Sequence, residues 1–107
     1  MSNKHYILAG HEVVEVPLKT WARWFEEADR RVAKDIIGDI EISTVFLGLN
    51  HGWNGQILLF ETMVFAKDRE EQDCYRYATW DEAYVGHKIV MINILGGRRY
   101  GIRPVRI

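Results

Sequence analysis

The side chains best suited to contact a ligand lie in a short insert between two apolar runs. In "STVFLGLNHGWNGQILLFETMVF", residues 43–65, the insert is Asn50-His51-Gly52-Trp53-Asn54-Gly55-Gln56. An imidazole, an indole and the amides of two asparagines could contact a partner or a small molecule, and exposed tryptophans are frequent in binding hot spots. The glycines and asparagines are also ordinary turn formers. The sequence leaves both interpretations open: a plain turn, or a contact loop in which Trp53, His51 and Asn54 meet a partner.

Glu61 is the most anomalous charged residue, because it lies within an apolar segment, residues 57–65. If this segment is a strand, Glu61 shares a face with four apolar side chains: Ile57, Leu59, Met63 and Phe65. A carboxylate in such surroundings has to be paired, protonated or at a sheet edge. We expect a structural ion pair with Arg76, and an acid of raised pKa in a cleft is the alternative.

Metal and nucleophile chemistry find less support. The four histidines have no ligand-like spacing to one another or to Cys74, and no HExxH or CxxC occurs. They are His5, His11, His51 and His87. The G-x-S-x-G, P-loop and G-x-G-x-x-G patterns are also absent. We therefore expect no metal and no cofactor, and we interpret Cys74 as a small buried hydrophobic residue.

The composition is that of one folded domain. The chain has 107 residues, of which 48% are hydrophobic and 27% are charged. This is long enough for one core and too short for two. The single cysteine excludes an intramolecular disulfide, and we find no signal peptide and no apolar run long enough to cross a bilayer. These features predict a protein of the cytoplasm.

Charge is distributed unevenly along the chain. Residues 36–95 carry four basic and nine acidic side chains, whereas residues 96–107 carry four arginines and no acid. An acidic body lacks the broad basic face of a DNA-binding domain, so we expect nucleic-acid contact at most through the tail. Three of its arginines, Arg98, Arg99 and Arg103, could dock on an acidic partner. A solvated end without a function is the simpler interpretation.

The elements that must position these residues begin with two short extended segments, at 6–9 and 13–16. Pro17 ends the second, and helical spacing then predicts an amphipathic helix over residues 18–29. Its apolar stripe contains Leu18, Trp21, Phe25 and Ala28. Trp24 lies beside that stripe and could be a half-exposed contact residue.

The middle of the chain changes to strand patterns. Residues 31–37 and 40–49 are rich in β-branched side chains, and Gly38-Asp39 between them suits a two-residue type II′ hairpin turn. Residues 57–65 predict a third strand, whose continuous hydrophobicity indicates a central position with both faces covered. Residues 74–78 alternate like a fourth strand.

A second helix is expected over residues 80–94. Thr79-Trp80-Asp81-Glu82 forms a capping-box pattern, in which Thr79 and Glu82 satisfy each other's backbone amides. Gly96 and Gly97 end the helix. The order of elements predicts an α+β domain over residues 1–95, an antiparallel sheet of about four strands with two helices on one face, followed by an arginine-rich tail at 96–107.

Four segments of the chain resemble a family of small uncharacterised proteins found in tailed bacteriophages and prophages. They are "TWARWFEEADRRVAK", "STVFLGLNH", "LLFETMVF" and "RYATWDEAYVGH", and they span about residues 20–87. The resemblance implies expression in the cytoplasm of a bacterial host. It carries over no activity and no catalytic residue.

We therefore expect a non-enzymatic binding protein, encoded by a phage or prophage, that acts on a host or phage macromolecule. Inhibition of a bacterial defence system is one version of this hypothesis, with a protein as the partner. A small enzyme or nucleotide-binding protein using the 50–56 loop, Glu61 and Arg76 is one alternative, and a minor virion or assembly component is another. The sequence leaves self-association open.

Overall fold

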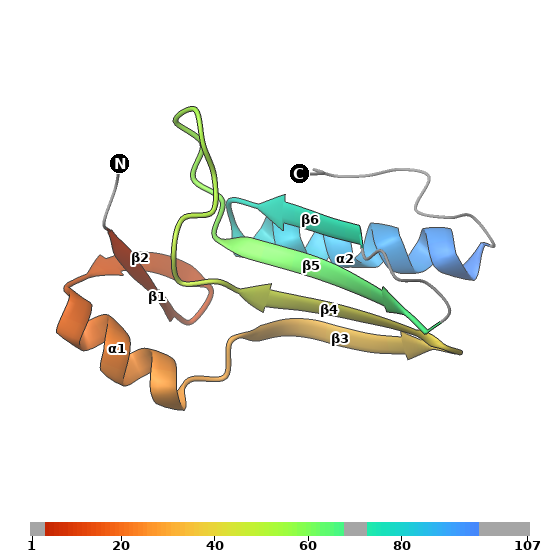
Figure 1. Cartoon of the computed structure of the whole chain (residues 1–107), viewed down its shortest axis with the longest axis horizontal. Coiled ribbons are helices and arrows are strands. Elements are labelled where there is room, and N and C mark those ends of the chain that lie inside the picture. Colours follow the sequence, from red (N-terminus) through yellow and green to blue (C-terminus); the bar gives the residue numbers. More distant parts are fainter. Residues whose placement is uncertain (1–3, 68–72, 97–107) are drawn as a thin grey trace.

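The computed structural model describes residues 4–67 and 73–96. It contains a small hairpin, a larger sheet and two helices (Figure 1). In chain order the elements are β1 (His5–Ala9), β2 (Glu12–Val16), α1 (Leu18–Glu27), β3 (Arg31–Ile37), β4 (Ile40–Phe46), β5 (Phe60–Ala66), β6 (Asp73–Tyr77) and α2 (Trp80–Leu95). The predicted α+β fold with a four-stranded antiparallel sheet is confirmed.

The larger sheet is a meander in which sequence neighbours pair, in the order β3-β4-β5-β6. The predicted hairpin turn at Gly38-Asp39 is confirmed: Ile37 pairs with Ile40, and Gly38 has a φ of 58°. Positive φ at the first turn residue alone is the pattern of a type II′ turn. β4 ends at Phe46, earlier than predicted, because Gly48 turns the chain at a φ of 79° and Leu49 bridges to β1 instead.

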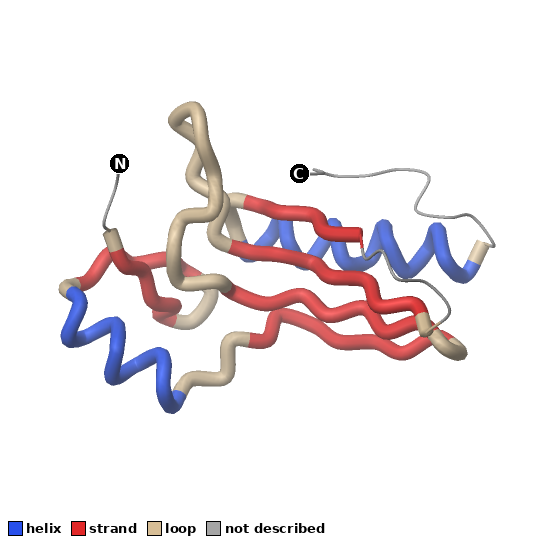
Figure 2. The backbone as a smooth tube through the Cα atoms, in the orientation of Figure 1, coloured by secondary structure: helices blue, strands red, loops and turns tan. Residues whose placement is uncertain are grey.

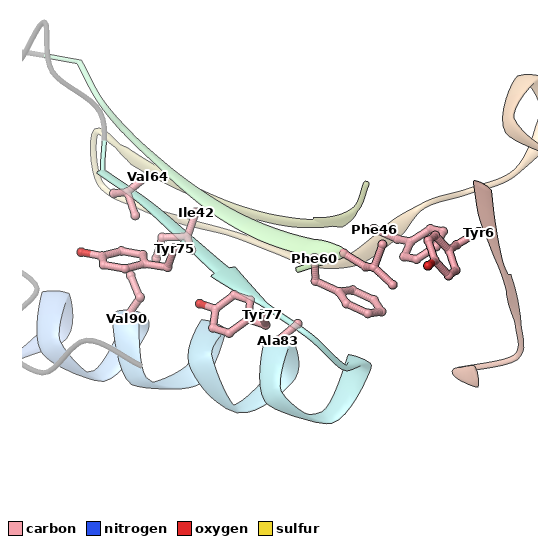
Figure 3. Close-up of a cluster of buried hydrophobic side chains, with 10 residues drawn as sticks. Tyr6, Ile42, Phe46, Phe60, Val64, Tyr75, Tyr77, Ala83 and Val90 are labelled. Carbon is pink, nitrogen blue, oxygen red and sulfur yellow. The ribbon is translucent and has the colours of Figure 1, made fainter. Parts of the chain in front are cut away.

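Alternation along the strands gives the sheet one buried and one open face. The buried face carries residues from β4, β5 and β6 (Figure 3): Ile42, Phe46, Phe60, Val64, Tyr75 and Tyr77. α2 covers most of this face, and Phe46 lies beyond the end of the helix, beside Tyr6. The expectation that residues 57–65 are covered on both faces is wrong. Glu61, Met63 and Phe65 are only partly buried, since no described element lies over their side of the sheet.

The two helices have different roles. α2 runs along the sheet and contacts all four of its strands, whereas α1 packs against β1 at one end of the molecule (Figure 2). α1 reaches the main core through Trp24, whose ring meets Phe46 edge-on with centroids 5.7 Å apart. A second contact ties the hairpin to the sheet unit, because His11 stacks on Trp80 with centroids 3.8 Å apart.

The predicted start of α2 is confirmed. The Glu82 amide donates to Thr79 Oγ1 at 3.1 Å, and the Thr79 amide donates to Glu82 Oε1 at 3.2 Å. This reciprocal capping box satisfies two backbone amides that would otherwise lack partners in the first turn. α2 then runs to Leu95, with Gly96 as its C-cap.

Candidate partner-binding loop

The segment between β4 and β5 projects from the end of the sheet as a long loop (Figure 1). Its two arms are joined by backbone hydrogen bonds. The Leu47 amide donates to the Leu59 carbonyl at 2.7 Å, and the His51 amide donates to the Leu58 carbonyl at 3.0 Å. The loop is therefore a narrow stem with a tip, which holds its tip residues well away from the core.

Asn50 organises the stem from the inside. Its Oδ1 accepts from the Gly52 amide at 2.8 Å and from the Leu58 amide at 2.9 Å, while its Nδ2 donates to the Gln56 carbonyl at 3.3 Å. One side chain thus joins both arms. Gly52 is required there, because a Cβ at this position would overlap the Gln56 carbonyl.

The tip is a tight turn over residues 53–56. Asn54 and Gly55 both have positive φ, 55° and 80°, and the Gln56 amide donates to the Trp53 carbonyl at 3.2 Å. Positive φ at both central residues is the type I′ pattern, for which Asn-Gly is the preferred pair. Trp53 occupies the first position of this turn and is 67% exposed. With this exposure, its side chain does not fold back onto the strands.

An open hollow of about 530 Å³ lies beside the stem. Loop residues line one side of it, including Trp53 and the 48% exposed Ile57, and Lys4 and Tyr6 line the other. The base of the loop is fixed to the same region, because the Tyr6 amide donates to the Gly48 carbonyl at 3.0 Å. The hollow combines apolar side chains with exposed amides. This composition suits contact with another protein.

The structure separates the other predicted contact residues. His51 and Asn54 are exposed on the loop beside Trp53. Trp24 is engaged with Phe46 and is only partly exposed, so it serves the core as well as the surface. The predicted tail residues lie outside the described part of the chain: Arg98, Arg99 and Arg103.

Glu61 and Arg76 form an ion pair on the open face of the sheet. Arg76 Nε donates to Glu61 Oε2 at 2.9 Å, and the Cys74 thiol donates to the same oxygen at 3.1 Å. Neither Glu61 nor Arg76 lines the hollow beside the loop. Burial, followed by the hydrogen bond to Glu61, raises the pKa of the Cys74 thiol from 9.0 to about 12. Cys74 therefore remains a thiol at neutral pH and is a poor nucleophile.

A buried chain of polar groups, which sequence analysis missed, links α2 to the sheet. His87 Nδ1 lies 2.7 Å from Thr44 Oγ1, which lies 2.5 Å from Thr62 Oγ1, and the Tyr77 hydroxyl donates to Thr62 at 3.0 Å. At the other end His87 Nε2 lies 2.7 Å from Asp35 Oδ2. The hydrogen bonds can all run in one direction, from Tyr77 through the two threonines and His87 to Asp35. Every hydroxyl then has an acceptor, and His87 carries its proton on Nε2.

An aspartate, a histidine and a hydroxyl in sequence resemble a catalytic triad, but the geometry does not serve catalysis here. Thr44, Thr62 and His87 are fully buried, so the hydroxyl that would act as nucleophile has no access to a substrate. The sequence contained a signal for this chain. His87 lies on the same face of the predicted helix as Ala83 and Val90, where a buried polar group requires a partner.

Among the described residues, no group of three or more His, Cys, Asp or Glu side chains could hold a metal ion. Neither of the two described helices is long and apolar enough to cross a membrane. No family model matches the chain, and comparisons with curated proteins and with solved structures find no match.

Proposed function

We propose that this chain is a non-enzymatic binding protein whose principal contact residue is Trp53 at the tip of the 50–56 loop. The observation that carries the proposal is a large aromatic side chain, two-thirds exposed, on a loop fixed by its own hydrogen bonds. An exposed tryptophan costs solubility in a free monomer, and tryptophan is the residue type most enriched in binding hot spots.

The rigidity of the loop supports this function. A flexible loop loses conformational entropy when it binds, whereas the Asn50 hydrogen bonds and the type I′ turn have already fixed this one. Trp53 and Ile57 supply apolar contact area, and His51 and Asn54 supply hydrogen-bonding groups around it. The chemistry fits a protein partner with an apolar pocket and a polar rim.

The resemblance to phage proteins is the basis for proposing which partner the loop binds. A small phage- or prophage-encoded protein in a bacterial cytoplasm would meet host proteins and phage proteins, and a component of a host defence system is one version of this partner. Glu61 and Arg76, the groups of the enzymatic alternative, are paired with each other and lie apart from the residues of the hollow.

The proposal is tested by capture from a bacterial lysate with the tagged full-length protein and with Trp53→Ala. We expect wild-type protein to retain a partner that Trp53→Ala loses by at least about tenfold, equivalent to about 1.4 kcal/mol. The thermal unfolding midpoint should stay unchanged, because an exposed tip residue contributes little to the core. Trp53→Phe should recover part of the capture.

Leu18→Ala is the matched control, since Leu18 is also a large, 58% exposed apolar residue but lies on α1. It should retain the partner. Equal capture by wild type and Trp53→Ala would show that the loop is only a connection. Loss of capture in Leu18→Ala as well would show that binding follows general surface hydrophobicity rather than the loop.

A further inference from the structure

The outer side of α2 carries large apolar side chains, although its inner side is already packed on the core through residues such as Val90, Met91 and Ile94. A surface helix usually presents polar side chains outward. The fully buried positions facing the sheet are Ala83, Gly86, His87, Val90 and Asn93. Two of these are polar and two are very small. On the opposite side, Val85 is 55% exposed, Ile92 62% and Leu95 66%.

These outer residues form a continuous stripe along the helix. Val85, Lys88, Ile92 and Leu95 follow one another at intervals of three, four and three residues, which is the spacing of a seam between two helices. Lys88 does not interrupt the stripe, because its Nζ lies over the Tyr84 ring, 5.2 Å from the centroid. The aliphatic part of Lys88 is thereby left along the seam.

We propose that this chain forms a homodimer in which the outer stripe of α2 packs antiparallel against the same stripe of a second copy. The stripe is complementary to itself in that orientation. Pairing centred between Lys88 and Ile92 places Val85 against Leu95 of the second copy, and it places the Lys88 stem beside Ile92 of the second copy. The two-fold symmetry then repeats both contacts, that of Val85 with Leu95 and that of the Lys88 stem with Ile92.

Charge favours the antiparallel orientation of the two copies. The first turn of α2 carries Asp81 and Glu82. Antiparallel pairing places the acidic starts of the two helices at opposite ends of the interface. The two helix dipoles are also opposed in this arrangement, whereas parallel pairing would align them and bring like charges together.

Sedimentation velocity of the full-length protein over a range of concentrations tests the dimer. We expect wild-type protein to shift from monomer to dimer as concentration rises, and Ile92→Glu to weaken dimerisation by at least about a hundredfold, because it buries a charge in the seam. Leu95→Glu, at the end of the helix, is a second variant with the same expectation. Both should unfold like the wild type, since the two side chains are exposed in the monomer.

Ile36→Glu is the matched control, because Ile36 is 66% exposed but lies on β3. It should dimerise like the wild type. The orientation is tested by cross-linking in a Cys74→Ser background, in which Val85→Cys with Leu95→Cys should form an intermolecular disulfide and Val85→Cys alone should not. A wild-type monomer at every concentration, a dimer that survives Ile92→Glu, or a dimer lost in Ile36→Glu would overturn the proposal. Trp53→Ala should leave dimerisation unchanged, so this proposal and the loop proposal can fail separately.

Discussion

His87 on α2 and Asp35 on β3 lie 52 positions apart in the chain and are joined by a 2.7 Å hydrogen bond between Nε2 and Oδ2. The histidine is completely buried, whereas the aspartate side chain is 40% exposed. This contact fixes α2 over the sheet at one register, since sliding the helix by one residue would separate His87 from both Asp35 and Thr44. Polar groups buried in this way specify a packing as well as stabilising it.

His87→Ala should be strongly destabilising. It leaves a cavity and removes the partner of the buried Thr44 hydroxyl, so we expect a loss of about 2–4 kcal/mol of unfolding free energy. The urea midpoint at constant slope measures this loss. Lys19→Ala, at an exposed position of α1, is the control and should change the midpoint little. An unchanged midpoint in His87→Ala would show that the polar chain contributes nothing to stability.

Gly86→Ala tests how closely α2 approaches the sheet. Alanine normally stabilises a helix interior by about 1 kcal/mol relative to glycine. Here a Cβ on Gly86 would overlap the phenol of Tyr77, a fully buried side chain, so the helix would have to move. We expect a net loss of about 1–3 kcal/mol, seen as a lower thermal midpoint. A rise in the midpoint would contradict the close packing of Gly86 on Tyr77.

Thr79→Ala removes the cap of α2. The Glu82 amide then loses its acceptor, and we expect a cost of about 1 kcal/mol. Thr20→Ala, at an exposed position within α1, is the matched control and should be close to neutral or slightly stabilising. Chemical denaturation of both variants measures the difference, and equal midpoints for the two variants would argue against the capping box.

Stability should fall in alkaline solution. Burial raises the pKa of Cys74 from 9.0 to about 12 and that of Tyr77 from 10.0 to about 12. The folded state therefore holds these two protons more tightly than the unfolded state. The resulting stabilisation is complete below about pH 9 and is lost as the pH rises towards 12.

Urea midpoints at about pH 8 and about pH 11 measure this loss. Lysines also titrate in this range, so Cys74→Ala is needed as a control. It should show a smaller decrease than the wild type, because only Tyr77 then contributes its shifted pKa. An identical decrease in both proteins would mean that the Cys74 thiol is not held in its protonated form.

Local features of this protein could be read from the sequence. The capping box at Thr79, the turn at Gly38 and the strand over residues 31–37 were predicted correctly, because each depends on a few neighbouring residues and on backbone preferences. The pairing of Glu61 with Arg76 was also inferable, since a carboxylate in an apolar strand needs a cation nearby. The pattern of side chains along each segment, and one charge within an apolar strand, were sufficient to predict these features.

The tertiary structure decided what local preferences leave open. Residues 57–65 looked like a strand with both faces covered, but a single helix lies over the sheet and leaves Met63 and Phe65 at its open face. The shape of the 50–56 loop depends on Asn50, which joins its two arms, and the exposure of Trp53 could not be read from the sequence. The link from Asp35 through His87 to Thr44 required three elements in one register, and such contacts between distant residues are set by packing rather than by any pattern within a single segment.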